Sequence, residues 1–212
     1  MPLQNRVDPL SVIHAVPERG TCMGNRGILH NEHQALVHYH RHKHWVICRL
    51  SFRERPPRTV MTPGRYTELF FLDEATAMSA GHRPCAECSH ARYREFLHYW
   101  RLGNPHLAGE KLDDVLHRDR FRPYRRNMRT KKRTYTSPIE ALPPGTFIMF
   151  EPDPSHQLYL LLEDSLRRWS FGGYGQPLER RTGVEVTVLT PKSTVNALAA
   201  GFRPQIYPEP HL

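Results

Sequence analysis

Cysteine is scarce in this chain of 212 residues, which holds four cysteines beside 19 prolines. So few cysteines fit a protein from a reducing compartment better than a disulfide-stabilised scaffold. The sequence has no run of about 18 apolar residues, so we expect no transmembrane helix and no membrane partner. The N-terminal segment lacks the apolar core of a signal peptide, and the cytoplasm is therefore the expected location.

Acidic residues are also in deficit, with 21 aspartates and glutamates against 30 lysines and arginines. The net charge of +9 favours a polyanionic partner, and nucleic acid is the first candidate, with DNA ahead of RNA. A basic but otherwise ordinary enzyme is the alternative. The sequence contains no Walker loop, dinucleotide-binding fingerprint or G-x-S-x-G elbow, so it indicates none of those enzyme classes.

The positive charge is densest between Arg118 and Arg133, where Phe121 and Tyr124 are interleaved with the cations. Cations bind phosphates and aromatic rings stack on bases, so we expect this segment to contact nucleic acid. A solvated basic linker is the alternative. The predicted contact residues are Arg118, Arg120, Arg122, Arg125, Arg126, Arg129, Lys131, Lys132 and Arg133.

Two of the four cysteines, Cys85 and Cys88, have C-x-x-C spacing. Thiols at this spacing bend round one tetrahedral metal ion, because the two residues between them form a tight turn. Cys48, in a predicted strand upstream, is the best third ligand, with Cys22 a weaker choice. The sequence therefore predicts a zinc site built on Cys48, Cys85 and Cys88.

The fourth ligand has several candidates, of which His44 is the first. The H-x-x-x-C spacing of His44 and Cys48 would chelate an ion across a helical turn or a loop. In an extended strand, however, the two side chains would lie about 13 Å apart and could not share one ion. His30, His33, Cys22 or a water molecule are then the alternatives, and a water would make the site an open one.

An aromatic strand, an alanine-rich helix and the motif G-x-R-P-C-x-x-C follow one another between Phe70 and Cys88. This order resembles the metal-binding domain of the Ada DNA-repair regulator and its short relatives. The stretch that contains Cys48 is similar to the C-R-P-x-C stretch of Ada, with Phe52 at the position of the second cysteine. The resemblance covers roughly residues 44–100 and implies a zinc module with a link to DNA repair.

In Ada, four thiolates hold the zinc ion, and the first of them takes a methyl group from DNA phosphotriesters. An imidazole in place of one thiolate would reduce the negative charge at the metal. We therefore expect a less nucleophilic Cys48 and do not carry over the methyl-acceptor activity. What the resemblance implies is a metal that is mainly structural.

Apolar periodicity and turn residues predict an α+β protein, with a small zinc-bound sheet and helices followed by a compact β-rich C-terminal unit. We expect an Ada-like zinc-binding domain with an irregular N-terminal segment, residues 1–27, over residues 1–110, a helix and basic linker over 111–136, and the β-rich unit over 137–212. Predicted helices cover 74–80, 89–101, 111–120 and 194–200. Predicted strands cover 45–52, 59–61, 66–72, 146–150, 157–162, 166–171 and 184–189. The glycine-rich stretches 19–27 and 169–175 are interpreted as a loop and a tight turn.

Six of the 14 histidines fall between residues 30 and 44. His38, His40, His42 and His44 alternate, so on a strand they would share one face. Ordinary solvated histidines, metal ligands and the acid–base groups of a nuclease-like site all fit this pattern.

The function that these patterns favour is a zinc-binding protein that contacts nucleic acid through a basic surface. One alternative is a metal-dependent enzyme acting on nucleic acid, either a nuclease or a DNA-repair factor, which an open metal position would favour. The other is a zinc-stapled protein-interaction module, which a flat salt dependence of binding would favour.

Overall fold

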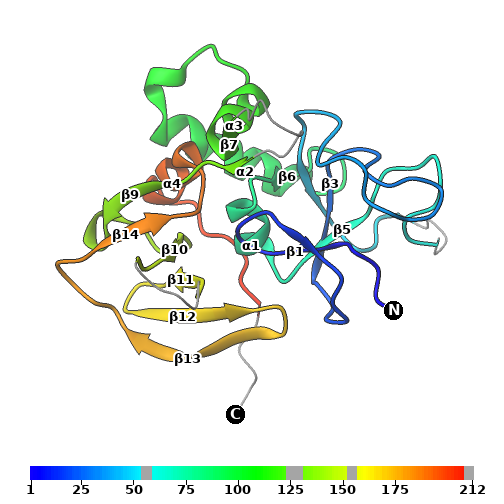
Figure 1. Cartoon of the computed structure of the whole chain (residues 1–212). Coiled ribbons are helices and arrows are strands. Elements are labelled where there is room, and N and C mark those ends of the chain that lie inside the picture. The colour runs from blue at the N-terminus through cyan, green and yellow to red at the C-terminus, as the bar shows by residue number, and fades with distance from the viewer. Residues whose placement is uncertain (54–58, 123–130, 152–156, 208–212) are drawn as a thin grey trace.

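The computed structural model describes residues 1–53, 59–122, 131–151 and 157–207 and contains two six-stranded sheets and four α-helices in that part of the chain. Figure 1 shows the N-terminal and C-terminal sheets beside one another, with the three later helices grouped at one end of both. The predicted α+β class with a β-rich C-terminal sheet is confirmed.

The N-terminal sheet has the order β2-β1-β5-β3-β4-β6 and is mostly antiparallel, but β1 pairs with β5, and β4 with β6, in parallel. Its strands are β1 (Arg6–Val7), β2 (Ile13–His14), β3 (Cys22–Asn25), β4 (Val46–Cys48), β5 (Leu69–Phe71) and β6 (Arg83–Pro84). Strands β1, β2 and β3 lie in the N-terminal segment expected to be irregular, and β3 falls in the stretch interpreted as a loop. Its Gly24 leaves room for the Phe71 ring, because a Cβ there would lie 2.3 Å from a ring carbon.

The helices form largely where the sequence predicts them. They are α1 (Glu74–Ser79), α2 (His90–Gly103), α3 (Leu112–Arg120) and α4 (Lys192–Ala199), with 3-10 turns at Pro105–Leu107 and Ile139–Ala141. The Asp73 carboxylate accepts a hydrogen bond from the Thr76 amide at 2.8 Å, so the predicted cap of α1 is confirmed. Gly81 follows this helix at a φ of 92°. No helix of the described residues combines the length and the apolar character needed to cross a bilayer.

The C-terminal sheet is antiparallel throughout, in the order β13-β12-β11-β10-β14-β9. Its strands are β9 (Tyr135–Pro138), β10 (Phe147–Met149), β11 (Tyr159–Leu161), β12 (Ser165–Ser170), β13 (Gly173–Glu179) and β14 (Glu185–Val188). The tight turn predicted near Phe171 is confirmed and joins β12 to β13. Strand β13 was not predicted, because it is largely exposed and has no apolar alternation. Two further short strands, β7 (Phe121–Arg122) and β8 (Lys131–Lys132), pair only with each other.

The predicted strand over residues 59–61 is wrong, and the alternating histidines are not on a strand. Residues 59–61 form a turn, in which Met61 has a φ of 56° and its amide donates to the Glu68 carboxylate. Residues 38–44 are irregular, so the alternating histidines do not share a strand face. Instead, the amides of His38 and Arg41 donate to carbonyls of the preceding loop.

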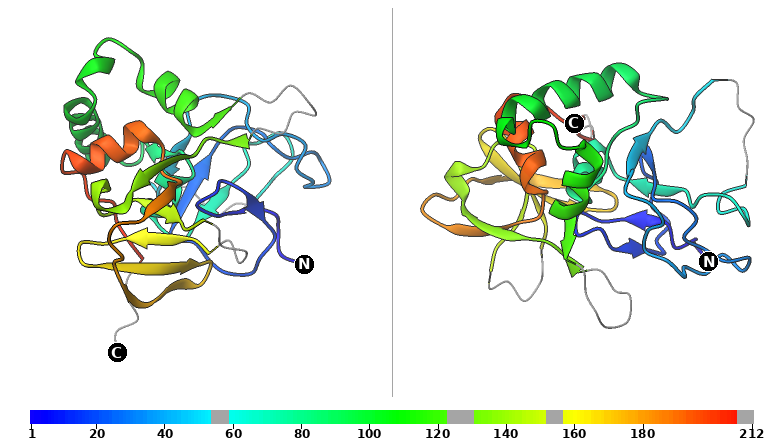
Figure 2. Two further views of the ribbon diagram at one scale, coloured as in Figure 1. Left: turned by 60° about the vertical axis from the view of Figure 1, so that its left-hand side comes forward. Right: turned by 90° about the horizontal axis from the view of Figure 1, so that it is seen from above.

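One hydrophobic core joins the three segments that the sequence suggested. Phe71, Phe96, Val115, Leu198 and Phe202 all belong to it, and the rings of Phe96 and Phe202 lie 5.2 Å apart edge to face. Helix α4 therefore packs on α2, as Figure 2 also shows. Helix α4 and Phe202 are therefore part of the same core as the N-terminal sheet.

Replacing Phe202 by alanine should lower the free energy of unfolding by about 3–5 kcal/mol, because the ring is fully buried between α2 and α4. Urea unfolding followed by tryptophan fluorescence should show one cooperative transition at a lower midpoint. The exposed Leu178 is the control, and its replacement by alanine should change stability by less than about 0.5 kcal/mol. Two separate transitions would show that the C-terminal unit folds independently.

Candidate metal centre

The end of β4 and the turn before α2 bring three cysteines together. Val46 pairs with Arg83 and Ile47 with Pro84 in parallel register, so Cys48 and Cys85 occupy the next step of the ladder. The Cys85 amide continues this pairing by donating to the Ile47 carbonyl at 3.0 Å. The chain then turns tightly, with the Ser89 amide donating to the Cys85 carbonyl at 3.1 Å.

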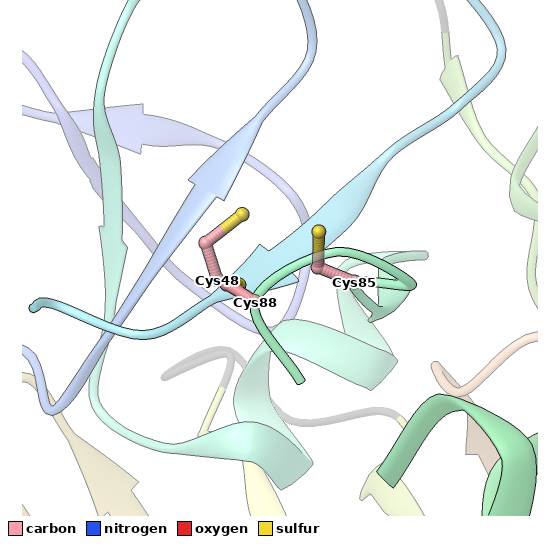
Figure 3. Close-up of side chains that lie close together, drawn as sticks. All are labelled: Cys48, Cys85 and Cys88. Carbon is pink, nitrogen blue, oxygen red and sulfur yellow. The ribbon is translucent and has the colours of Figure 1, made fainter. Parts of the chain in front are cut away.

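The three thiols converge on one point, as Figure 3 shows. The sulfur atoms of Cys48, Cys85 and Cys88 lie within 4.8 Å of one another. Sulfur ligands of a tetrahedral ion with bonds of about 2.3 Å lie about 3.8 Å apart, so small side-chain movements close the cluster round a metal. The three cysteines can therefore hold a metal ion.

The protons of the cluster are shared unequally. Hydrogen bonds from the Cys48 thiol and from the backbone amides of Cys88 and Glu87 together lower the pKa of Cys85 to about 5, against the opposing effect of burial. The same hydrogen bond, followed by burial, raises the pKa of Cys48. The Glu87 amide lies 3.4 Å from the Cys85 sulfur. Cys85 is therefore the thiol of the cluster that most readily becomes a thiolate, which is the form that binds a metal cation.

The predicted fourth ligand, His44, is not at the metal centre. It precedes β4 by two residues, and the extended strand separates it from Cys48. Its Nδ1 lies 2.6 Å from the Asp113 carboxylate on α3 instead. The assignment of His44 as a metal ligand is therefore corrected.

The alternative ligands also lie elsewhere. His30 is buried, with Nδ1 2.6 Å from the Thr67 hydroxyl and Nε2 3.2 Å from the Thr62 carbonyl. His33 is exposed beside Glu32, 3.5 Å away. Cys22 lies on β3 opposite Phe71, and burial raises the pKa of its thiol well above the usual value. Among the described residues, no fourth histidine, cysteine or carboxylate joins the three sulfur atoms.

A cavity of about 530 Å³ opens beside the three thiols. Phe52, Glu68 and Arg49 are among the residues that line it. The remaining lining residues include the rings of Tyr66 and Phe70. A volume of this size is in the range of small-molecule sites, so a ligand or water could reach the metal from this side.

The predicted nucleic-acid contacts fall into four groups, of which the buried Arg120 is the last. Arg118 and Arg133 are exposed, although Arg118 pairs with Glu110 at 2.5 Å. Lys132 is half-buried, and its ammonium group donates to the Ser79 carbonyl at 2.5 Å. Residues Arg125, Arg126 and Arg129 lie outside the described residues, and so do the side chains of Arg122 and Lys131.

Arg120 is the member of this set that the structure contradicts. Its side chain is 2 % exposed, and its guanidinium group donates to the carbonyls of Gly81 and Lys43 at 2.8 and 2.6 Å. The guanidinium carbon lies 3.9 Å from the centre of the Trp45 ring. Burial lowers the pKa of Arg120 to about 9. Arg120 therefore supports the core and is not available to an external phosphate.

A second buried arginine, Arg26, escaped the sequence analysis. Its guanidinium carbon lies 4.1 Å from the Trp45 ring centre, and its Nε donates to His82 Nε2 at 3.2 Å. The residue stands in a glycine-rich stretch, where an arginine is expected at the surface, so no sequence signal marks it. Burial and the two arginines hold the pKa of His82 well below its usual value, which keeps this ring a neutral acceptor.

In comparisons with known proteins, no protein-family model, no curated protein and no solved structure matches the chain. The resemblance to the Ada metal-binding domain stays a prediction from the motif. The geometry alone carries the metal-binding statement, through Cys48, Cys85 and Cys88.

Replacing Cys85 or Cys48 by serine removes a direct metal ligand. Metal affinity should therefore fall by more than about 100-fold, the upper range for loss of a residue that only hydrogen-bonds to a ligand. Titration with Co²⁺ would measure this, since thiolate ligands give charge-transfer absorption. Cys22→Ala is the matched control, because Cys22 lies outside the cluster. Equal loss of the absorption in all three variants would contradict the assignment.

Stability should fall as the pH drops below about 6.5, the usual pKa of histidine in an unfolded chain. Burial lowers the pKa of His82, His40 and His117 in the folded protein, so the unfolded state binds more protons in this range. Between pH 6.5 and 5.5, His82→Gln should lose about 1 kcal/mol less stability than the wild type. Urea unfolding at both pH values measures this difference. The control His33→Gln changes an exposed side chain, and an equal effect in both variants would refute the account.

Proposed function

We propose that this protein binds zinc through Cys48, Cys85 and Cys88 and contacts nucleic acid through a basic surface, with the metal mainly structural. The convergence of three thiols from separate elements is the observation that carries the proposal. Zinc is the preferred metal because soft thiolates in a tetrahedral arrangement suit it, and its d-electrons impose no other geometry.

A structural role for zinc follows from the elements that the three cysteines link. Strands β4 and β6 are three and two residues long, and such short strands contribute few hydrogen bonds. A metal bound by Cys48 on one side and by the turn before α2 on the other would hold them together. Its binding free energy would then be folding free energy.

Nucleic acid is proposed as the partner because of the excess of cations. The net charge of +9 attracts a polyanion at long range. Of the nine predicted contacts, Arg118 and Arg133 are exposed among the described residues, and Arg120 is withdrawn. The resemblance to Ada favours DNA, with RNA as the alternative, and a DNA-repair context.

A metal-dependent enzyme acting on nucleic acid is the second candidate function. The cavity beside the thiols favours it, since only three ligands are found among the described residues. Zinc with a water molecule at its fourth position would lower the pKa of that water toward 7. Zinc K-edge absorption separates the two roles. Three sulfur ligands and a fourth protein ligand would favour a structural zinc ion, whereas a bound water oxygen would favour a metal-dependent enzyme.

Replacing Arg125, Arg126 and Arg129 together by alanine should weaken binding to duplex DNA and reduce its salt dependence. Each lost phosphate contact lowers the slope of log K against log salt by about 0.9, so a drop of about 2–3 is expected. Fluorescence anisotropy across a salt series gives both quantities.

The control variant changes three exposed arginines elsewhere, Arg19, Arg65 and Arg94, to alanine. This variant has the same net charge as the first but keeps the predicted contact segment. Equal slopes for the two variants would show that the charge acts without a defined contact surface. Absence of binding to DNA and RNA would remove the nucleic-acid part of the proposal and favour a protein-interaction module.

A further inference from the structure

A second cavity, of about 550 Å³, lies between α2, the start of α3 and the loop before β4. His42, Lys43 and His44 line it from the loop, and Asp113 lines it from α3. Tyr93 and Trp100 are among the residues of α2 in its wall. The three cysteines are not part of its lining, so it is separate from the metal centre.

His44 is held in this cleft by a fixed carboxylate. Arg83 binds Asp113 with two hydrogen bonds of 2.8 and 2.7 Å, and the pKa of Asp113 is lowered by Arg83 and His44 against the opposing effect of burial. The anionic carboxylate accepts from His44 Nδ1 at 2.6 Å. This bond fixes the proton on Nδ1 and leaves Nε2 to act on a substrate. The imidazole side chain is 70 % exposed, so a substrate can reach it.

His42 lies beside His44, and the centres of the two imidazole rings are 6.1 Å apart. Burial, followed by His44 and Arg120, lowers the pKa of His42, so its ring is neutral at pH 7. Its Nδ1 is buried and has no hydrogen-bond partner among the described residues. Nε2 is therefore the nitrogen left for proton transfer. Both rings can reach one phosphodiester, since each hydrogen bond spans about 2.6–3.2 Å.

The unpaired charges of the cleft are positive. Asp114 pairs with Lys43, and Glu110 with Arg118, while Asp113 pairs with Arg83. Arg101 and Lys111 also line the cleft and have no ion pair within the described part of the chain. Trp100 is 3 % exposed, and its indole N–H has no hydrogen-bond partner among the same residues. A ligand with anionic oxygens would pair with Arg101 and Lys111, whereas the buried Trp100 N–H is not open to it.

We propose that this cleft cleaves RNA without a metal ion, with His42 as general base and His44 as general acid. His42 takes the proton of a ribose 2′-hydroxyl while that oxygen forms a bond to phosphorus. His44 acts as the imidazolium, which carries a second proton on Nε2, and gives that proton to the 5′-oxygen while the bond between phosphorus and that oxygen breaks. The products are a 2′,3′-cyclic phosphate and a 5′-hydroxyl. Proton exchange with water resets both rings, so no co-reactant is consumed.

The choice of RNA follows from the chemistry of the cleft. RNA carries its own nucleophile beside the phosphate, whereas DNA would need an activated water. The resemblance that favours DNA concerns the metal centre, and the cleft lies at the other end of β4. The proposal rests on the proposed nucleic-acid contact and adds a substrate and a reaction to it. Asp113 and Arg83 are positioning residues in this scheme.

The test uses the full chain and a fluorescent DNA oligonucleotide that contains one ribonucleotide, without added divalent ions. We expect cleavage at the ribonucleotide, with a 2′,3′-cyclic phosphate identified by mass spectrometry. His44→Asn keeps an amide that can hydrogen-bond to Asp113, and it should lower the single-turnover rate about 100-fold or more. His42→Gln should act similarly. His33→Asn, which changes an exposed histidine beside a carboxylate, should leave the rate unchanged.

Three results would overturn the proposal: no cleavage at the ribonucleotide, an equal rate in His44→Asn and wild type, or equal cutting of an all-DNA strand. Anisotropy with the same oligonucleotide separates this failure from that of the proposed function. Binding without cleavage would overturn only the proposed reaction in the cleft. Absence of binding would overturn both this reaction and the proposed contact with nucleic acid. If the ion pair of His44 with Asp113 were only a clamp, His44→Asn would lower the melting temperature and leave cleavage unchanged.

Discussion

Two steps of parallel pairing, Val46 with Arg83 and Ile47 with Pro84, hold both candidate sites in place. At the C-terminal end of β4 the pairing delivers Cys48 to Cys85. At the N-terminal end it sets Arg83 where it can bind the Asp113 carboxylate that holds His44. A one-residue slip would turn these side chains to opposite faces of the sheet. The register of this short strand pair therefore determines the position of both sites, although it contributes few hydrogen bonds.

The centre of the N-terminal sheet is held by cations that face rings and carbonyls. Arg26 and Arg120 lie over the Trp45 ring, and their charges are offset by the quadrupole of the indole and by backbone carbonyls. Buried charge of one sign costs free energy unless each donor is satisfied. Keeping His82 neutral limits that cost. The surplus of basic residues is thus partly internal, and net charge overstates the positive charge offered to a partner.

The sequence predicted what local patterns encode. The C-x-x-C turn, the Asp73 cap and the strands of the C-terminal sheet with apolar alternation all have short-range signals, and most of their boundaries lie within two or three residues. Strand β13 and the buried position of Arg120 have no such signal, because exposed strands lack alternation and an arginine in a basic run is expected in solvent. His44 failed as a ligand because ligation depends on β4 being extended, which spacing alone could not decide.

The separation of the two sites along β4 resolves a conflict between the functional readings of this chain. The proposed structural metal, bound by electron-rich thiolates, argues against a reaction at the three thiols. The two neighbouring histidines argue for a reaction in the separate cleft. His44 precedes β4 and binds Asp113, whereas Cys48 is the last residue of β4 and joins the other two thiols. One bound strand that follows β4 would pass both sites. Metal at one end of β4 would stiffen the pairing that orients Asp113 at the other. A structural metal and a metal-free reaction are therefore compatible in one fold.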